Sequence, residues 1–386
     1  MPATRRKNML YRLALPVLAP RPGRRLRLEI QGDPPVHLKE YEKLLRKHHV
    51  LGSAALLSDG KRRTVLLCST EKPLHRVSTS SMFRIASITK MAAALAALVA
   101  AEQHRLLLDQ PVLSCFPELG DLQALQGVTP RHLLSHTSGL RDPEGLESAL
   151  VRGIPFPEIL NQAGPSEPGK VFQYSNLGFG LIGSLLERIY GEPVSLIMKK
   201  LVFDPLQMNA TVNASELREE TIVPITRVLP YRPGKDLIKT PLGERPLREP
   251  DPLRHYGYTA GAMYLDLFSL EKLMICLMHS GKPLLSSDLG KEMIRRHADY
   301  GKASPTLSYG LGLLRIQDPT LSSSLLLGHQ GFAYGCADGA FWEESTGKMV
   351  LFLNGGASEA RRGRLGLCNY DVLKWALRKE MPEWSR

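Results

Sequence analysis

The chain has 386 residues, 43% of them hydrophobic and 23% charged, which excludes wholesale disorder and allows two or three domains of about 150 residues. No uninterrupted apolar run approaches the ~18 residues that a membrane-spanning helix needs, so an integral membrane protein is excluded. The five cysteines are scattered without a C-x-x-C pair, which argues against a disulfide framework or a structural zinc site. Reduced thiols fit a reducing compartment better, and we expect a cytoplasmic protein.

The formal net charge of +12 is concentrated at the N-terminus. Residues 1–30 contain eight basic side chains and the single acid Glu29, so they contribute +7. We interpret residues 1–37 as a basic arm, and a solvated arm is the simpler interpretation. Weak contact with a membrane or another anionic surface is the alternative; no nucleic acid is expected, because the one aromatic ring, Tyr11, makes no stacking platform. The apolar run 13–19 is short and broken by a proline, so export is not supported, though it stays open.

Regular elements are predicted from about residue 38 onwards. Apolar residues at helical spacing predict a helix over 38–47. Two short apolar runs, 53–57 and 64–68, flank an Asp59-Gly60 turn and predict a β-hairpin. An Ala/Leu-rich segment without Gly or Pro then predicts a buried helix over 87–103.

The rest of the chain is predicted to be helical first and sheet-forming later. Residues 120–250 indicate helices joined by Pro- and Gly-marked loops, for example a helix over 187–201. Seven prolines between Pro224 and Pro252 mark a long irregular connection. The remaining predicted elements are a helix over 267–279, strands over 324–327, 339–342 and 349–353, and a final helix over 371–379.

Strands near both ends and helices between them predict an α/β fold with an insertion. We expect an α/β domain built from residues 38–115 and 255–386. Residues 116–254 are expected to form a mainly helical insertion with the Pro-rich connection at its end.

Several common catalytic motifs are absent: there is no Walker phosphate loop, no H-E-x-x-H zinc helix and no G-x-S-x-G elbow. Gly178-x-Gly180-x-x-Gly183 imitates a dinucleotide fingerprint, but the segment before it is short and polar where the fingerprint needs a buried strand. We therefore interpret these glycines as contacts for close helix packing.

Ser-x-x-Lys is the first motif that carries chemistry, although it occurs five times in the chain. Only Ser87 opens a long apolar helix. Three residues along a helix rotate by about 300°, so Ser87 and Lys90 project from nearly the same face. A helix start also offers free backbone N–H groups for a developing oxyanion. The alternative, a capping serine with a solvated lysine, is disfavoured by the apolar residues around Lys90.

Two further segments are candidates, each ambiguous by itself. In Tyr174-Ser175-Asn176, a neighbouring ammonium could stabilise a phenolate that accepts the serine proton, and the asparagine would point to the same side. The alternative is a packed loop tyrosine and a helix cap. His329-Gln330-Gly331 follows an apolar run, where glycine lets a substrate approach the backbone. Its alternative is a structural histidine at a strand end.

Together, Ser-x-x-Lys, Tyr-x-Asn and His-x-Gly in this order resemble the serine β-lactamase and penicillin-binding-protein superfamily, in its class C β-lactamase-like branch. The resemblance spans roughly residues 38–380 and implies an antiparallel sheet flanked by helices. Other similar segments are residues 83–90, 133–140, 168–176, 203–206, 260–262 and 309–312.

The resemblance implies a serine hydrolase that works through an acyl-enzyme on an ester or amide. Ser87 would be the nucleophile, and Lys90 and Tyr174 would manage its proton. Asn176, His329, Gly331 and Phe332 would bind substrate. The oxyanion hole would use the backbone N–H of Ser87 and of Phe332. No metal or organic cofactor is implied.

The third motif departs from the family pattern, because penicillin-recognising members usually carry Lys-Thr-Gly where this chain has His329-Gln330-Gly331. An unperturbed histidine, with a pKa near 6.5, is mostly neutral at pH 7 and so lacks the permanent positive charge of a lysine. We therefore expect an esterase or peptidase rather than a true β-lactamase. An acyltransferase on the same fold and a catalytically silent receptor remain as alternatives. The expected partner is a small ester, amide or peptide substrate.

Overall fold

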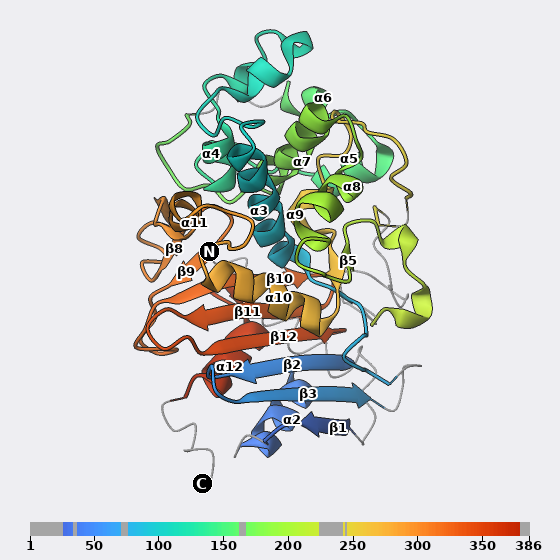
Figure 1. Cartoon of the computed structure of the whole chain (residues 1–386), viewed down its shortest axis with the longest axis vertical. Helices are drawn as coiled ribbons and strands as arrows, with labels where there is room; N and C mark the ends of the chain where they lie inside the picture. Colours follow the sequence, from blue (N-terminus) through green and yellow to red (C-terminus); the bar gives the residue numbers. More distant parts are fainter. Residues whose placement is uncertain are drawn as a thin grey trace.

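The computed structural model describes residues 26–33, 37–70, 76–161, 167–223, 242–243 and 245–378. Most of the predicted basic arm and residues 224–241 of the predicted Pro-rich connection lie outside the described residues. Figure 1 shows one large twisted sheet and, above it, a layer of helices. In the described ranges, no helix is both long and apolar enough to cross a membrane.

The sheet has nine antiparallel strands in the order β1-β3-β2-β12-β11-β10-β9-β8-β7. Both parts of the chain contribute to it: β2 pairs with β12 so that Leu56 lies opposite Leu351. The predicted antiparallel sheet fed from both chain ends is therefore confirmed. Its strands are β1 (Leu26–Gln31), β2 (Gly52–Ser58), β3 (Arg63–Thr70), β7 (Ala298–Asp299), β8 (Leu307–Tyr309), β9 (Leu314–Ile316), β10 (Leu326–Ala333), β11 (Cys336–Glu343) and β12 (Met349–Gly355).

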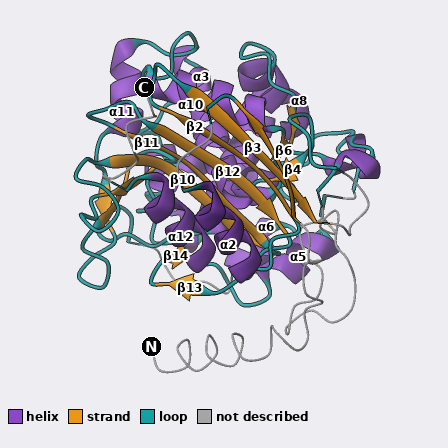
Figure 2. Cartoon of the chain, turned by 90° about the horizontal axis from the view of Figure 1, so that it is seen from below, coloured by secondary structure: helices purple, strands orange, loops and turns teal. Residues whose placement is uncertain are grey.

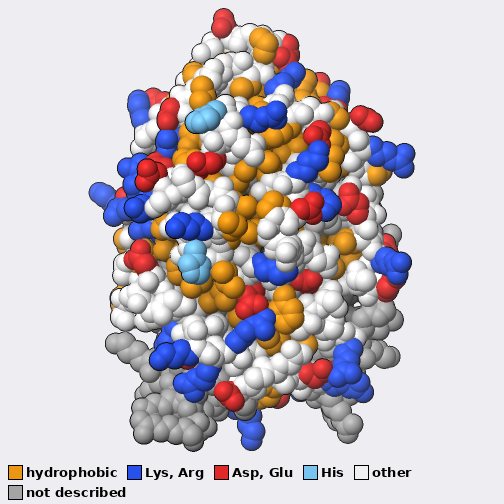
Figure 3. Space-filling view, in the orientation of Figure 1, with side chains coloured by type: hydrophobic (Ala, Val, Ile, Leu, Met, Phe, Trp, Pro, Cys, Tyr) orange, Lys and Arg blue, Asp and Glu red, His pale blue; other side chains and the backbone are white. Residues whose placement is uncertain are grey.

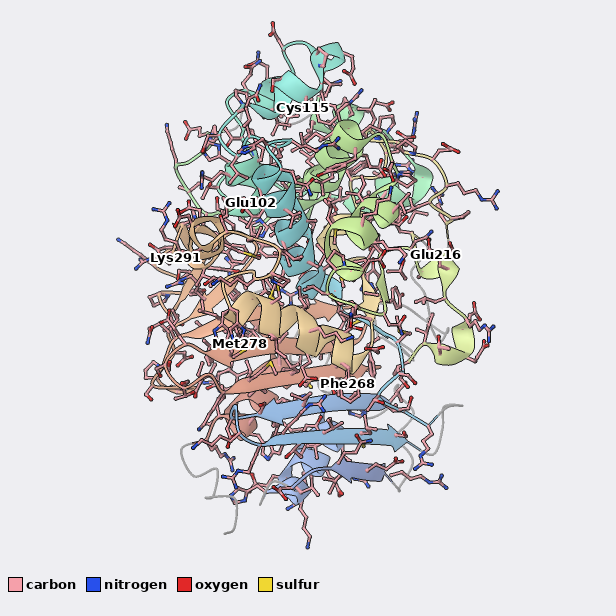
Figure 4. All side chains as sticks on the ribbon, viewed as in Figure 1. Glu102, Cys115, Glu216, Phe268, Met278 and Lys291 are labelled. Atoms are coloured by element: carbon pink, nitrogen blue, oxygen red, sulfur yellow. The ribbon has the colours of Figure 1, made fainter. Side chains whose placement is uncertain are left out.

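Helices cover both faces of the sheet, which is why the central strands are apolar on both sides. Every residue of β11 and β12 is buried. Viewed from below in Figure 2, α2 (Leu38–Lys47) and α12 (Leu367–Ala376) lie on the near face. On the other face α10 (Leu267–Met278) crosses the middle of the sheet, with Phe268 and Met278 marking its two ends in Figure 4.

The helical layer is organised around α3 (Thr89–Glu102), in which twelve of fourteen residues are buried. A helix buried on all sides needs the small side chains that alanine supplies here. The other helices of this region are α4 (Pro130–Leu134), α5 (Leu146–Arg152), α6 (Phe156–Leu160), α7 (Asn176–Tyr190), α8 (Val194–Met198), α9 (Tyr258–Gly261) and α11 (Ser287–Ile294). Short helical turns are η1 (Ala86–Ile88), η2 (Val112–Cys115), η3 (Pro117–Leu119), η4 (Gln123–Leu125), η5 (Lys199–Phe203), η6 (Ala214–Glu216) and η7 (Glu219–Thr221). Two small sheets complete the fold: β4 (Phe83–Arg84), β5 (Ala210–Thr211) and β6 (Tyr264–Leu265), and the hairpin of β13 (Arg361–Arg362) and β14 (Leu365–Gly366).

Several predicted boundaries are wrong, including that of the final helix, which begins at Leu367 and ends at Ala376. Strand β1 lies inside the segment interpreted as an arm, where Leu28 and Ile30 alternate with charged residues and the strand pairs with β3 at the edge of the sheet. The helix predicted over 187–201 is interrupted, because α7 ends at a Gly191 with φ +67° and Pro193 precedes α8.

The glycine interpretation is confirmed. A Cβ on Gly180 of α7 would lie 1.4 Å from the Tyr256 carbonyl oxygen, and one on Gly183 would lie 2.8 Å from Thr259 Oγ1. These glycines let α7 and α9 approach closely, as helix packing requires. On the face shown in Figure 3, Lys and Arg are interspersed with Asp and Glu, so no single charge dominates that surface.

Candidate active site

Ser87 stands in the turn η1 at the entry to the buried helix α3. Just before it, Ala86 has a φ of +45°, a left-handed conformation that costs a non-glycine residue about 1–3 kcal/mol. Thr89 holds this turn, because its Oγ1 donates to the Ala86 carbonyl at 2.6 Å and accepts the Met263 N–H at 3.2 Å. The strained turn presents Ser87 to a cavity.

Lys90 lies one turn further along and is completely buried. Its Nζ lies 3.2 Å from Ser87 Oγ and donates to Asn176 Oδ1 at 2.9 Å and to the Ala260 carbonyl at 2.6 Å. Burial lowers the pKa of Lys90 to about 7, against the opposing charge of Asp142. Near pH 7 much of Lys90 is therefore an uncharged amine that can accept a proton.

Tyr174 contacts the same serine from the other side. Its hydroxyl donates to Ser87 Oγ at 2.9 Å. The predicted phenolate is wrong, because burial raises the pKa of Tyr174 well above its usual value near 10. Lys90 Nζ lies over the face of the ring, 5.0 Å from its centroid. Tyr174 is thus a proton donor in the resting site, while Lys90 has the pKa of a base.

His136, from the segment 133–140, fixes the loop segment before α7 that carries Tyr174. Its backbone carbonyl accepts the Gln173 N–H at 2.7 Å, and its Nδ1 accepts the Ser175 N–H at 3.2 Å. The imidazole is 4.2 Å from the Tyr174 ring between centroids. Burial lowers the pKa of His136 well below its usual value, so the ring stays neutral and acts as a positioning residue.

Asp142 is a site residue that the sequence analysis did not identify. One oxygen accepts from Ser175 Oγ and the Leu177 N–H, both at 2.9 Å. The other accepts the Asn176 N–H at 3.0 Å and Asn176 Nδ2 at 2.8 Å. The carboxylate thereby accepts hydrogen bonds from the first backbone N–H groups of α7, and it orients the Asn176 amide so that Oδ1 faces Lys90.

His329 differs most from its prediction. Its side chain is 2% exposed; Nδ1 lies 2.7 Å from the Gln330 carbonyl and Nε2 lies 2.8 Å from the Tyr309 hydroxyl. Burial, reinforced by the nearby charge of Lys90, lowers the pKa of His329 to about 3. The expectation of a histidine that titrates near 6.5 and offers a donor to substrate is therefore wrong. Both nitrogens are engaged within the protein, and the ring is neutral at physiological pH.

Gly331 and Phe332 lie on β10, which runs past Ser87 and not only up to residue 327 as predicted. A Cβ on Gly331 would lie 2.3 Å from the Ile85 carbonyl oxygen, so only glycine allows β10 to lie against the turn that carries the nucleophile. The strand was not fully predicted, because two of its residues are glycines and strand prediction relies on β-branched and aromatic residues.

These groups meet at a cavity of about 700 Å³. Ser87, Tyr174, Asn176, His329 and Phe332 line it, whereas Lys90 and Gly331 lie behind its surface. Apolar side chains of α5 and aromatic side chains near β8 and β10 supply much of the wall. Those side chains include Leu146, Leu150, Val151, Phe172, Tyr300 and Leu307.

A serine hydroxyl that is hydrogen-bonded to a buried amine of lowered pKa and to a phenol is in the environment of an activated nucleophile. The fold and this centre, together with the relatives below, define a serine hydrolase that acts on an ester or amide. The chain belongs to the beta-lactamase family: the sequence profile of the family, described as Beta-lactamase, matches residues 38–363. The predicted resemblance is confirmed.

Individual relatives span most of the chain. Esterase EstB of Burkholderia gladioli is 27% identical over 378 residues, which cover 86% of this chain and 93% of the esterase. The D-amino acid amidase from Ochrobactrum anthropi SV3 has a TM-score of 0.65 at 24% identity, over 85% of this chain and 95% of the amidase. EstCE1, a hydrolase with promiscuous acyltransferase activity, has a TM-score of 0.64 at 21% identity, over 86% of this chain and 96% of EstCE1. The two structural likenesses establish the fold.

Proposed function

We propose that the protein hydrolyses carboxylic esters through an acyl-enzyme on Ser87, with amides as slower substrates. The observation that carries this proposal is the hydrogen-bonded Ser87–Lys90–Tyr174 centre at the base of a cavity. The extended similarity to an esterase supports esters over other acyl donors. The neutral, internally bonded His329 supports poor recognition of β-lactams, since it supplies no charge where many relatives carry lysine.

The proposed reaction has two halves. Uncharged Lys90 takes the Ser87 proton as Oγ attacks the carbonyl carbon, and the oxyanion is held by the backbone N–H groups of Ser87 and Phe332. Tyr174 donates its phenolic proton to the leaving alcohol oxygen as the ester C–O bond breaks, and protonated Lys90 returns a proton to Tyr174. In the second half, water attacks the acyl carbonyl carbon and gives a proton to uncharged Lys90. The bond between Ser87 Oγ and the acyl carbon then breaks, the carboxylic acid leaves, and Ser87 Oγ takes the proton back from Lys90. Asn176 positions the lysine and the substrate carbonyl.

The pH dependence of a neutral ester tests the role of Lys90. We expect kcat/KM to rise with pH through about 7 and then to level off, because protonated Lys90 cannot accept a proton. Burial sets this pKa, Asp142 raises it and Arg84 lowers it. His136 and His329 stay neutral over the same range, so no second limb is expected between pH 5 and 9. A profile that is flat across pH 7 would contradict the assignment of Lys90 as the base.

Substrate preference tests the proposal directly. A charge-assisted hydrogen bond is worth about 1.5–3 kcal/mol, or roughly 10- to 150-fold in affinity. We therefore expect kcat/KM for 4-nitrophenyl acetate or butyrate to exceed that for nitrocefin by at least about tenfold, with Ser87 acylated in intact-mass spectra. Nitrocefin turnover as efficient as ester turnover would overturn the preference for esters.

A further inference from the structure

The hairpin β13–β14 forms one wall of the cavity, and the third motif holds it there. The Gln330 side chain donates from Nε2 to the Arg364 carbonyl at 2.8 Å. Its Oε1 accepts the Gly366 N–H at 2.9 Å and Asn369 Nδ2 at 3.2 Å. The residue next to His329 is thus used to fix a neighbouring loop beside the nucleophile.

Two arginines of this hairpin, Arg361 and Arg364, line the cavity. Both residues are exposed overall, but local burial lowers the pKa of Arg361, so its guanidinium is partly shielded from solvent. The Arg361 guanidinium lies 4.8 Å from the centre of the Phe332 ring. Burial raises the pKa of Tyr174 and of Tyr300, and the positive charges of Arg361 and Arg364, respectively, oppose these shifts. The positive charge of the hairpin therefore acts on the catalytic phenol and on Tyr300, a second ring that lines the cavity.

The acidic groups of the cavity form no ion pair with these two arginines among the described residues, although the negative charge of Glu359 acts on Arg361 and raises its pKa against the effect of burial. Asp142 is saturated by the four hydrogen bonds at the start of α7. Glu147 accepts the Tyr334 hydroxyl, and Glu359 accepts the Gly335 N–H at 2.9 Å. In the described part of the chain, neither arginine has a carboxylate within ion-pair distance. Three arginines and one glutamate leave residues 359–366 with a net charge of +2.

We propose that Arg361 and Arg364 form a carboxylate-binding subsite, so that the preferred esters carry a carboxylate several bonds from the scissile carbonyl. This inference rests on the proposed function and adds the substrate class to it. A guanidinium presents a planar fork of N–H donors that matches a carboxylate, and partly shielded pairs of this kind discriminate well between charged and neutral ligands. Because the arginines stand on the hairpin and not on β10, they suit a flexible carboxylate arm more than one fixed to a β-lactam ring.

Matched ester pairs test the subsite. Mono(4-nitrophenyl) adipate and 4-nitrophenyl hexanoate differ by a carboxylate on the acyl chain, and 3-acetoxybenzoate and its methyl ester differ by one on the leaving group. We expect the wild type to have a higher kcat/KM for the charged ester than for the neutral one in the pair whose carboxylate lies on the side of the scissile bond that faces the hairpin. In Arg361→Gln or Arg364→Gln the ratio of kcat/KM between charged and neutral esters should fall about tenfold or more, mainly through KM.

Arg362→Gln is the matched control, because Arg362 lies on the same hairpin but stacks on Tyr370 at 3.8 Å and does not line the cavity. It should leave the ratio unchanged. A ratio that is unaffected by both test variants, or that falls equally in Arg362→Gln, would overturn the subsite. Failure of the proposed function is distinguishable, since it would show as absent Ser87-dependent hydrolysis of the neutral esters in the wild type.

Discussion

Replacing Ser87 by alanine is expected to lower turnover of 4-nitrophenyl esters by several orders of magnitude. Among the described residues, Ser87 Oγ is the one hydroxyl that is hydrogen-bonded to both Lys90 and Tyr174, so no neighbouring hydroxyl can take its place. The melting temperature should change little, because the side chain faces a cavity and contributes little packing. Steady-state kinetics and a thermal melt on the purified variant check both expectations.

Ser345→Ala provides the control, since Ser345 belongs to another Ser-x-x-Lys sequence but is exposed in the turn between β11 and β12. That variant should keep full activity and should still be labelled by a fluorophosphonate. Full activity in Ser87→Ala, or labelling of that variant, would show that a different residue is the nucleophile.

Replacing Lys90 by methionine is expected to lower kcat/KM by about a thousandfold or more. The methionine keeps most of the buried volume, but the base is lost, and Asn176 Oδ1 and the Ala260 carbonyl lose their donor. Some stability should be lost as well, so activity is compared on folded protein verified by circular dichroism. Lys348→Met, in the Ser345-x-x-Lys348 sequence, should be indistinguishable from wild type, because Lys348 is partly exposed and does not line the cavity.

The same assay on Tyr174→Phe distinguishes the contribution of Tyr174 to proton transfer from that of Lys90. The ring keeps its packing against His136 but loses the hydroxyl bonded to Ser87, and a fall of about a hundredfold is expected. A harmless Tyr174→Phe beside a crippling Lys90→Met would show that the lysine manages the proton alone.

Much of the fold could be predicted, because its signals are local. The Asp59-Gly60 turn, the alanine-rich α3 and the glycines of α7 each impose one local solution, and the structure has all three. Strand β10 could not be placed as well, because Gly331 is required by the close approach of the Ile85 carbonyl, which lies far away in the sequence, and Gly328 by the close approach of the Ala340 carbonyl. Edge strand β1 was hidden within a basic segment.

In the active site too, the features that depend on nearby residues in the sequence could be predicted, and those that depend on tertiary packing could not. The spacing alone indicated that Ser87 and Lys90 lie on the same face of a helix. The order of the motifs predicted that Tyr174 and Asn176 belong to the same site, and the structure brings all four residues into contact. The electrostatics could not be predicted, because a pKa depends on burial. Lys90 proved to be the group with a pKa near neutrality and His329 proved to be a neutral core residue. Asp142 carries no motif; its role is visible only where four donors converge on it.

The pairing of β2 with β12 has a consequence for the order in which the protein matures on the ribosome. The nucleophile, the lysine and the tyrosine are all synthesised within the first half of the chain, but β10, β11 and β12 are synthesised only after residue 325. Pairings between such distant segments close late in folding, since a long loop must be ordered first. A growing chain therefore carries all three reactive side chains from residue 174 to residue 326 without the strand that completes the cavity wall. We expect hydrolytic activity only after β10, β11 and β12 have joined the sheet.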